Sequence, residues 1–219
     1  KVAGTRADAD GDLKGGLELV LNAQSMEPSS KRIAEIKTEL VCLVHPPTAV
    51  KDLREFIDSF GSSEALDSTL AACLMEVKTA EAKEEADQLI EAVILRNPGQ
   101  LKALSLKAEQ LASEGRYAEA VQAYQDVLKY HPAAYMAHYG VATGLLSLGR
   151  NKEALDHLDR YLSVDPTDVD ALFLRAGARV DVGNLKGAAS DLKVLQNKIP
   201  EAPELPGLAN RILKAEQSR

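Results

Sequence analysis

Apolar residues recur at helical spacing through most of the chain, with polar residues between them. Leu104, Ala108 and Leu111 are four and three positions apart, so they share one face of a helix. In the segment that follows, Val121 and Tyr124 resume the apolar spacing. The pattern predicts amphipathic helices in consecutive pairs, each with one face turned toward a common core.

The helical pattern repeats with a period of 34 residues. Four prolines mark the period: Pro98, Pro132, Pro166 and Pro200. Before each of the last three there is a glycine 17 positions upstream (Gly115, Gly149, Gly183) and an alanine 12 positions upstream (Ala120, Ala154, Ala188). We expect each glycine to end a first helix in the left-handed conformation, each alanine to lie where two helices cross, and each proline to close the second helix.

A 34-residue helix–turn–helix unit with glycine, alanine and closing proline at these offsets resembles the tetratricopeptide repeat. The resemblance is strongest over 101–202, and the first large position of the signature holds Leu104, His138 and Leu172 in place of the usual Trp. It implies an all-α fold, a right-handed superhelical solenoid of antiparallel helix pairs extending over 1–219 as a single domain. About six repeats are expected, followed by a capping helix at about 203–217. Their bounds are 1–30 (truncated), 31–66 (degenerate, with Pro46 and Pro47 in its turn), 67–100 (with Glu81 in place of the turn glycine), 101–134, 135–168 and 169–202.

Composition and charge exclude several classes of protein. Aromatic residues make up 4% of the chain and Trp is absent, which argues against a β-sandwich. The net charge of −7 argues against a nucleic-acid partner, and no apolar run is long enough for direct membrane insertion. The chain begins at Lys1 rather than Met, as expected of a piece of a longer or processed polypeptide. The compartment stays open, with the cytoplasm favoured.

Catalytic and metal-binding motifs are not evident. Cys42 and His45 form a single C-x-x-H without a second pair, and Cys73 is better interpreted as a buried structural residue. The acidic segment 8–12 lacks the glycine and glutamate positions of a calcium loop. His157 is expected at the surface or at the rim of the groove. We therefore expect no enzyme activity, no cofactor and no metal.

The resemblance implies that the first helices of successive repeats line a concave groove, through positions 2, 5, 6, 9, 12 and 13 of each unit. These positions are rich in small, apolar and aromatic residues, which is typical of adaptable protein-binding grooves. The groove is expected to bind an apolar or amphipathic segment of a partner protein. Its candidate residues are Met75, Leu106, Glu109, Met136, Tyr139, Thr143, Phe173 and Leu174.

One partner class within the family is not expected. Relatives that hold the acidic tails of chaperones use a clamp of Lys, Asn and Arg at fixed repeat positions. Those positions here hold Ser105, Glu109, Gly140, Asp170 and Leu174, and the two acids would repel a carboxylate. The chain is therefore not expected to be a carboxylate clamp for chaperone tails.

Two alternatives to a groove-binding scaffold stay open. The chain could be a structural spacer or assembly arm that uses its convex faces and ends. The stretch 61–100 favours this modestly, since it has eight acidic residues against three basic ones and could dock a basic partner. The chain could also be the accessory domain of an enzyme whose catalytic part precedes Lys1. The oligomeric state is not indicated.

Overall fold

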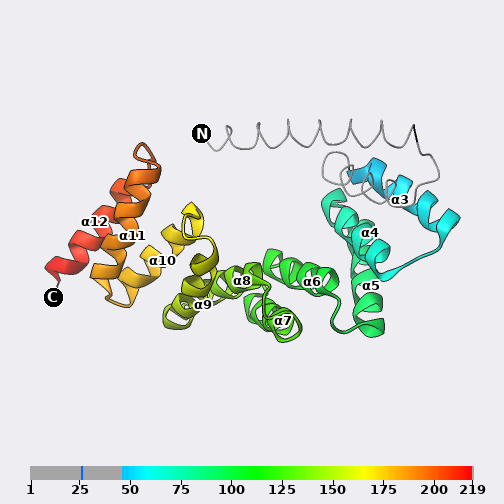
Figure 1. The fold of residues 1–219 in the computed structure, drawn as a ribbon, viewed down its shortest axis with the longest axis horizontal. Coiled ribbons are helices and arrows are strands. Elements are labelled where there is room, and N and C mark those ends of the chain that lie inside the picture. Colours follow the sequence, from blue (N-terminus) through cyan, green and yellow to red (C-terminus); the bar gives the residue numbers. More distant parts are fainter. Residues whose placement is uncertain (1–25, 27–45, 219) are drawn as a thin grey trace. The chain divides into compact units, whose positions relative to one another are not determined.

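The computed structural model describes Met26 and residues 46–218, and all its regular elements in that part are α-helices (Figure 1). The chain divides into two compact units, Lys1–Ala103 (unit 1) and Leu104–Arg219 (unit 2). The predicted all-α class and the pairing of consecutive helices are confirmed. The expected repeat 1–30 and most of 31–66 lie outside the described residues, and a single solenoid over 1–219 stays a prediction.

Unit 1 contains three described helices, α3 (Pro46–Phe60), α4 (Glu64–Val77) and α5 (Ala80–Arg96). Helix α3 packs on α4, and α4 on α5. Two prolines occupy the first turn of α3, where a missing backbone N–H breaks no intrahelical hydrogen bond. As the apolar spacing predicts, Leu53 and Phe56 of α3 are buried.

The turn between α4 and α5 differs from the expected one. Helix α4 ends at Val77, and Lys78 adopts the left-handed conformation with φ 58°. The hydroxyl of Thr79 then accepts the backbone N–H of Ala82 and begins α5. A left-handed lysine thus replaces the glycine of the other repeats, three residues before the position at which Glu81 was expected to stand in for it.

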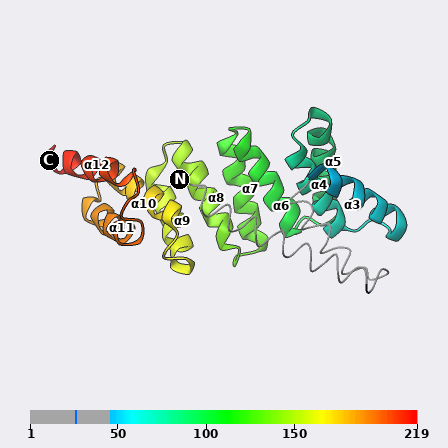
Figure 2. The same ribbon diagram turned by 90° about the horizontal axis from the view of Figure 1, so that it is seen from above.

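Unit 2 consists of helix hairpins in chain order (Figures 1 and 2). Helix α6 spans the unit boundary, and unit 2 takes it from Leu104 onward. The helices are α6 (Leu101–Ser113), α7 (Tyr117–Tyr130), α8 (Tyr135–Ser147), α9 (Asn151–Val164), α10 (Val169–Asp181), α11 (Leu185–Lys198) and α12 (Leu205–Gln217). Each of the ranges 101–134, 135–168 and 169–202 contains one pair of these helices.

The turn inside each of these three hairpins has the same hydrogen bonds. Gly115, Gly149 and Gly183 have φ between 72° and 81°, the left-handed conformation expected of them. In the first turn, the N–H of Arg116 donates to the carbonyl of Leu111, and the N–H of Gly115 to that of Ala112. This is a Schellman motif, and it satisfies carbonyls that the end of α6 would otherwise leave unpaired.

Small residues allow close helix contacts in the core of unit 2. Ala120, Ala154 and Ala188 are fully buried, as predicted for crossing positions. Helix α8 approaches α7 closely at Gly144, where an added Cβ would lie 2.6 Å from Val121 Cγ2. At the C-terminal end, α12 buries three apolar side chains and packs on α11 and α10, which agrees with the expected helix at about 203–217. They are Leu205, Leu208 and Ile212.

Candidate partner-binding face

The predicted groove residues are divided between the two units. Met75 lies half-buried on α4 of unit 1, and the other seven lie on α6, α8 and α10 of unit 2. Leu106 is only 9% exposed and belongs to the core, so it offers a partner little surface. We call the remaining six the first-helix face of unit 2: Glu109, Met136, Tyr139, Thr143, Phe173 and Leu174.

Apolar surface is concentrated on two helices of this face. Met136 on α8 is 56% exposed. Tyr139, Phe173 and Leu174 are half-buried, with part of each side chain against the core and part available to solvent. The hydroxyl of Thr143 donates to the carbonyl of Gly140 at 3.0 Å, so its polar group is already satisfied within α8. Helix α8 also contacts α10 directly.

Two tyrosine rings of α8 lie against a third tyrosine ring on α9. The Tyr139 ring lies 5.1 Å from the buried ring of Tyr161 on α9, and the Tyr135 ring lies 5.7 Å from it. The Tyr161 hydroxyl donates to Asp168 Oδ2 at 2.9 Å, while Asp168 Oδ1 accepts the N–H of Ala171 and caps α10. Burial raises the pKa of Tyr139, and the negative charges of Asp170 and Asp168 raise it further.

Tyr124 of α7 also lies next to the first-helix face, and the sequence pattern did not predict this position. Tyr124 was expected to be one of the apolar residues of its helix, yet it is only half-buried, with its ring against Gly140 of α8. Burial raises the pKa of its hydroxyl to about 12, and the charge of Glu109 adds to the effect. Partial desolvation likewise raises the pKa of Glu109, although its side chain is exposed overall. The signal was available in the sequence, because a glycine within α8 leaves room for a ring from the preceding helix.

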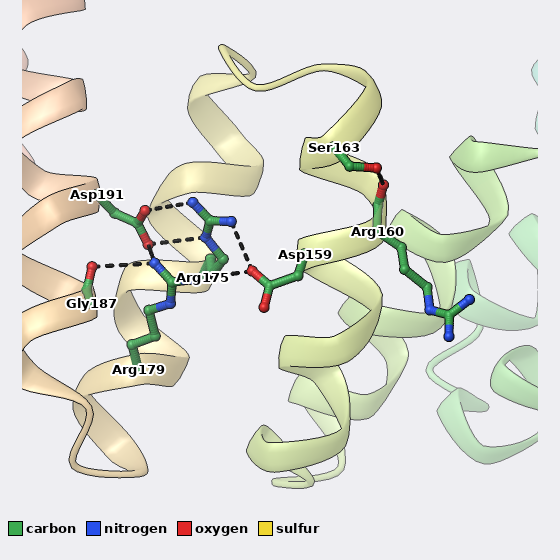
Figure 3. A network of polar contacts seen from close by, with 7 residues as sticks. All are labelled: Asp159, Arg160, Ser163, Arg175, Arg179, Gly187 and Asp191. Carbon is green, nitrogen blue, oxygen red and sulfur yellow. Dashed lines mark hydrogen bonds and ion pairs between the residues drawn. The ribbon is translucent and has the colours of Figure 1, made fainter.

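An ionic network centred on the buried Asp191 joins α9, α10 and α11 (Figure 3). Arg175 donates to both oxygens of Asp191, at 2.6 and 3.1 Å, and Arg179 donates to Asp191 Oδ2 at 2.8 Å. Asp159 Oδ1 accepts from both guanidinium groups, at 2.8 and 3.1 Å. Asp191 is 2% exposed, so the two arginines compensate a carboxylate inside the core. The two arginines and the two aspartates neutralise one another, so the network has no uncompensated charge that would bind a ligand.

This network was not predicted from the sequence pattern. Arg175 and Arg179 stand one period after Val141 and Leu145, both of which are buried in α8. This pattern could have revealed the network, because two charged residues four positions apart on one helix stand at positions that are buried in the preceding repeat. Asp191 likewise stands one period after His157.

His157 makes the corresponding polar contact in the preceding repeat. Its Nδ1 lies 3.0 Å from Nδ1 of His138 on α8, and both rings are half-buried. The sequence predicted a surface or groove-rim position for His157, and the structure shows its ring half-buried and facing the adjacent helix. Burial lowers the pKa of both imidazoles, and Arg160 lowers it further.

For the described residues, the structure shows the state of Cys73, the absence of a metal-ligand cluster and the absence of a membrane-spanning helix. Cys73 is fully buried on α4 and disulfide-bonded, while Cys42 and the acidic segment 8–12 lie outside those residues. Within the described residues, no group of three or more His, Cys, Asp or Glu side chains could hold a metal ion. None of the helices there is both long and apolar enough to cross a membrane.

Paired helices of this length, joined in unit 2 by the same glycine turn, define the class of helical-repeat proteins. Residues 105–168 and 142–204 match the sequence profile of the tetratricopeptide repeat. Residues 105–204 of this chain therefore consist of tetratricopeptide repeats.

Two curated relatives match about half of the chain, and one solved structure matches most of it. A tetratricopeptide repeat and J domain-containing co-chaperone of Cryptococcus neoformans is 34% identical over 113 residues, 51% of this chain and 22% of the relative. The peroxisomal targeting signal receptor of Candida glabrata is 29% identical over 126 residues, 56% of this chain and 21% of the receptor. The chain thus spans about a fifth of the length of these curated relatives. The Cut9–Hcn1 hetero-tetramer structure shares the fold, with a TM-score of 0.76 at 11% identity over 93% of this chain and 40% of that one.

Proposed function

We propose that this chain is a non-catalytic scaffold whose first-helix face in unit 2 binds an apolar or amphipathic segment of a partner protein. The observation that carries the proposal is the exposure of Met136 beside Tyr139, with Phe173 on the neighbouring first helix. Met and aromatic side chains bury large areas on binding and adapt to partner shape. The similar proteins described above include one named as a co-chaperone and one named as a targeting signal receptor. These names support a role in protein binding for the tetratricopeptide repeats of this chain.

The test compares two triple variants with the same number of apolar residues removed. The first is Met136→Ser, Tyr139→Ser and Phe173→Ser. The control changes exposed apolar residues elsewhere in unit 2: Leu148→Ser, Val194→Ser and Leu213→Ser. The probe is a fluorescein-labelled peptide of about four helical turns, with leucines at helical spacing and glutamines between them. Its affinity is measured by fluorescence anisotropy, and circular dichroism checks that both variants fold.

We expect the first variant to weaken binding at least about tenfold, because anchor side chains typically contribute more than 1 kcal/mol each. The control variant should bind as the unchanged chain does. A loss confined to the control variant would instead favour the assembly-arm alternative, in which faces outside the first helices are used. Equal binding by all three proteins would refute the proposal.

A further inference from the structure

Tyr161 and Asp168 connect α8 and α10, the two helices on which the apolar residues of the first-helix face lie. Tyr161 of α9 is only 4% exposed, and the centre of its ring lies 5.1 Å from that of Tyr139 on α8. Its hydroxyl donates to Asp168 Oδ2 at 2.9 Å, and Asp168 Oδ1 accepts the N–H of Ala171 at 2.7 Å. Because Ala171 lies in the first turn of α10, these contacts run without interruption from α8 through α9 to the start of α10.

The two residues depart together from the repeats on either side. One period before and one period after, the position of Tyr161 holds a buried aliphatic side chain and the position of Asp168 holds alanine. These residues are Val127 and Leu195 for the first position, and Ala134 and Ala202 for the second. Helix α8, whose N-cap is Ala134, accordingly begins without a hydrogen bond from a capping side chain. Core packing at the first position therefore needs only an apolar side chain, and the hydroxyl and carboxylate add a polar connection to it.

The apolar residues of the face are divided between the helices that this pair connects. Met136 and Tyr139 belong to α8, and Phe173 belongs to α10. Tyr139 and Phe173 both pack against the hydrophobic core that contains Tyr161. A partner segment that contacts both helices must match the distance between them. A binding surface that is already ordered also costs less free energy to bind than one that must first be ordered.

We propose that Tyr161 and Asp168 are positioning residues, which hold α8 and α10 at a fixed separation and thereby select partner segments by the spacing of their apolar residues. This rests on the function proposed above and specifies what the first-helix face selects. Neither side chain has to contact the partner, because Tyr161 is buried and both carboxylate oxygens of Asp168 accept hydrogen bonds within the chain.

The test uses the full chain and three fluorescein-labelled helical peptides, each with two Leu-Leu pairs among glutamines and alanines. The two pairs are separated by one, two or three helical turns, that is by about 4, 7 or 11 residues. Fluorescence anisotropy gives the affinity of each peptide, and the spacing preference is the ratio between the tightest and the weakest. Circular dichroism and urea unfolding give the fold and the stability of each protein variant.

Three variants change the connection by different amounts. Tyr161→Phe removes only the hydroxyl, and Asp168→Ala removes both hydrogen bonds. Asp168→Asn is the conservative change, because its amide oxygen can still cap α10 while its amide nitrogen donates to the Tyr161 oxygen. The control is Val127→Ala, which removes buried apolar surface at the equivalent position of the preceding repeat and leaves the pair untouched.

We expect the unchanged chain to bind one peptide at least about tenfold tighter than another, as loss of an anchor contact does at a binding surface. Tyr161→Phe and Asp168→Ala should each reduce this preference at least about threefold, since a hydrogen bond to a charged group contributes that much or more. Asp168→Asn and Val127→Ala should keep it, although Val127→Ala lowers stability.

Three results would overturn the proposal. The first is equal binding of the three peptides by the unchanged chain, and the second is a preference that survives in Tyr161→Phe or Asp168→Ala. The third is an equal loss of preference in Val127→Ala, because general destabilisation would then explain the effect.

The failure of this proposal is distinct from the failure of the proposed function. If the Met136, Tyr139 and Phe173 variant abolishes binding while Tyr161→Phe keeps the spacing preference, the face binds protein segments but is not positioned by this pair. If the triple variant changes the binding of none of the three peptides, the proposed function itself is wrong.

Discussion

The ring of Tyr124 occupies the space in which a side chain at position 140 would lie, so Gly140, like Gly144, lets α7 and α8 approach. Gly140→Ala would overlap three ring atoms of Tyr124. We expect this change to lower the free energy of unfolding by about 1–3 kcal/mol, as overpacking in a core does. Urea unfolding followed by circular dichroism measures it.

The control for this change is Gly207→Ala in α12, where an added Cβ meets no atom within 4 Å. Alanine is the better helix former, so this variant should be unchanged or stabilised by up to about 1 kcal/mol. If Gly140→Ala behaves as Gly207→Ala does, the Tyr124 ring is free to move and does not fix the distance between the helices.

The ionic network should respond very differently to partial and complete replacement. Asp191→Leu leaves two arginines in the core without their buried partner, and we expect it to cost about 3–5 kcal/mol of unfolding free energy. Replacing Arg175 and Arg179 with Leu together with Asp191→Leu removes the charges as well, so most of that loss should be recovered. A triple variant as unstable as the single one would show that packing rather than charge compensation governs this site.

The crossing alanines should tolerate no larger side chain. Ala188 is fully buried and Ala189, the next residue of α11, is exposed. We expect Ala188→Leu to lower stability by about 1–3 kcal/mol, while Ala189→Leu should change it little. Thermal unfolding of the two variants compares the same chemical change at adjacent positions, and equal midpoints would contradict the crossing role.

The left-handed lysine predicts a stabilising substitution. Lys78 is exposed and has φ 58°, a conformation that costs an L-residue roughly 1–2 kcal/mol and costs glycine little. Lys78→Gly should therefore raise the free energy of unfolding by about 1 kcal/mol, after the greater freedom of glycine in the unfolded chain is counted. Glu84→Gly in the exposed interior of α5 should lower it by about the same amount. Two glycine variants that both destabilise would contradict the left-handed turn.

The histidine pair predicts a loss of stability in acid. Both imidazole pKa values are lowered in the folded chain, so below about pH 6.5 the unfolded chain binds more protons than the folded one. The contribution of the pair is complete above that pH and is lost as the pH falls through the lowered values. Thermal midpoints at pH 7.5 and pH 5 should differ less in a His138→Phe, His157→Gln variant than in the unchanged chain. An identical difference in both proteins would contradict the assignment.

Regular features of the repeat could be predicted from the sequence, because a glycine turn or a crossing alanine depends on one residue and its local backbone. Gly149 and Ala154 are examples. The missed features depend on pairs of side chains that are distant in sequence. His138 meets His157 from 19 positions away, and Asp191 is stable only because two arginines of the preceding helix reach it. A period of 34 residues predicts where the helices lie. It does not predict which polar side chains of neighbouring helices will form hydrogen bonds or ion pairs with one another.

Among these inter-helix contacts, Asp168 has a mechanical consequence. One of its oxygens holds the Tyr161 hydroxyl near the end of α9, and the other holds the first turn of α10. When the first turn of α10 unfolds, the Asp168 carboxylate is no longer held in place. The Tyr161 hydroxyl of the preceding repeat then loses its hydrogen bond to Asp168 in the same event. The repeats that contain α9 and α10 are therefore expected to unfold together where these helices meet, so that local unfolding there involves both repeats as one cooperative unit.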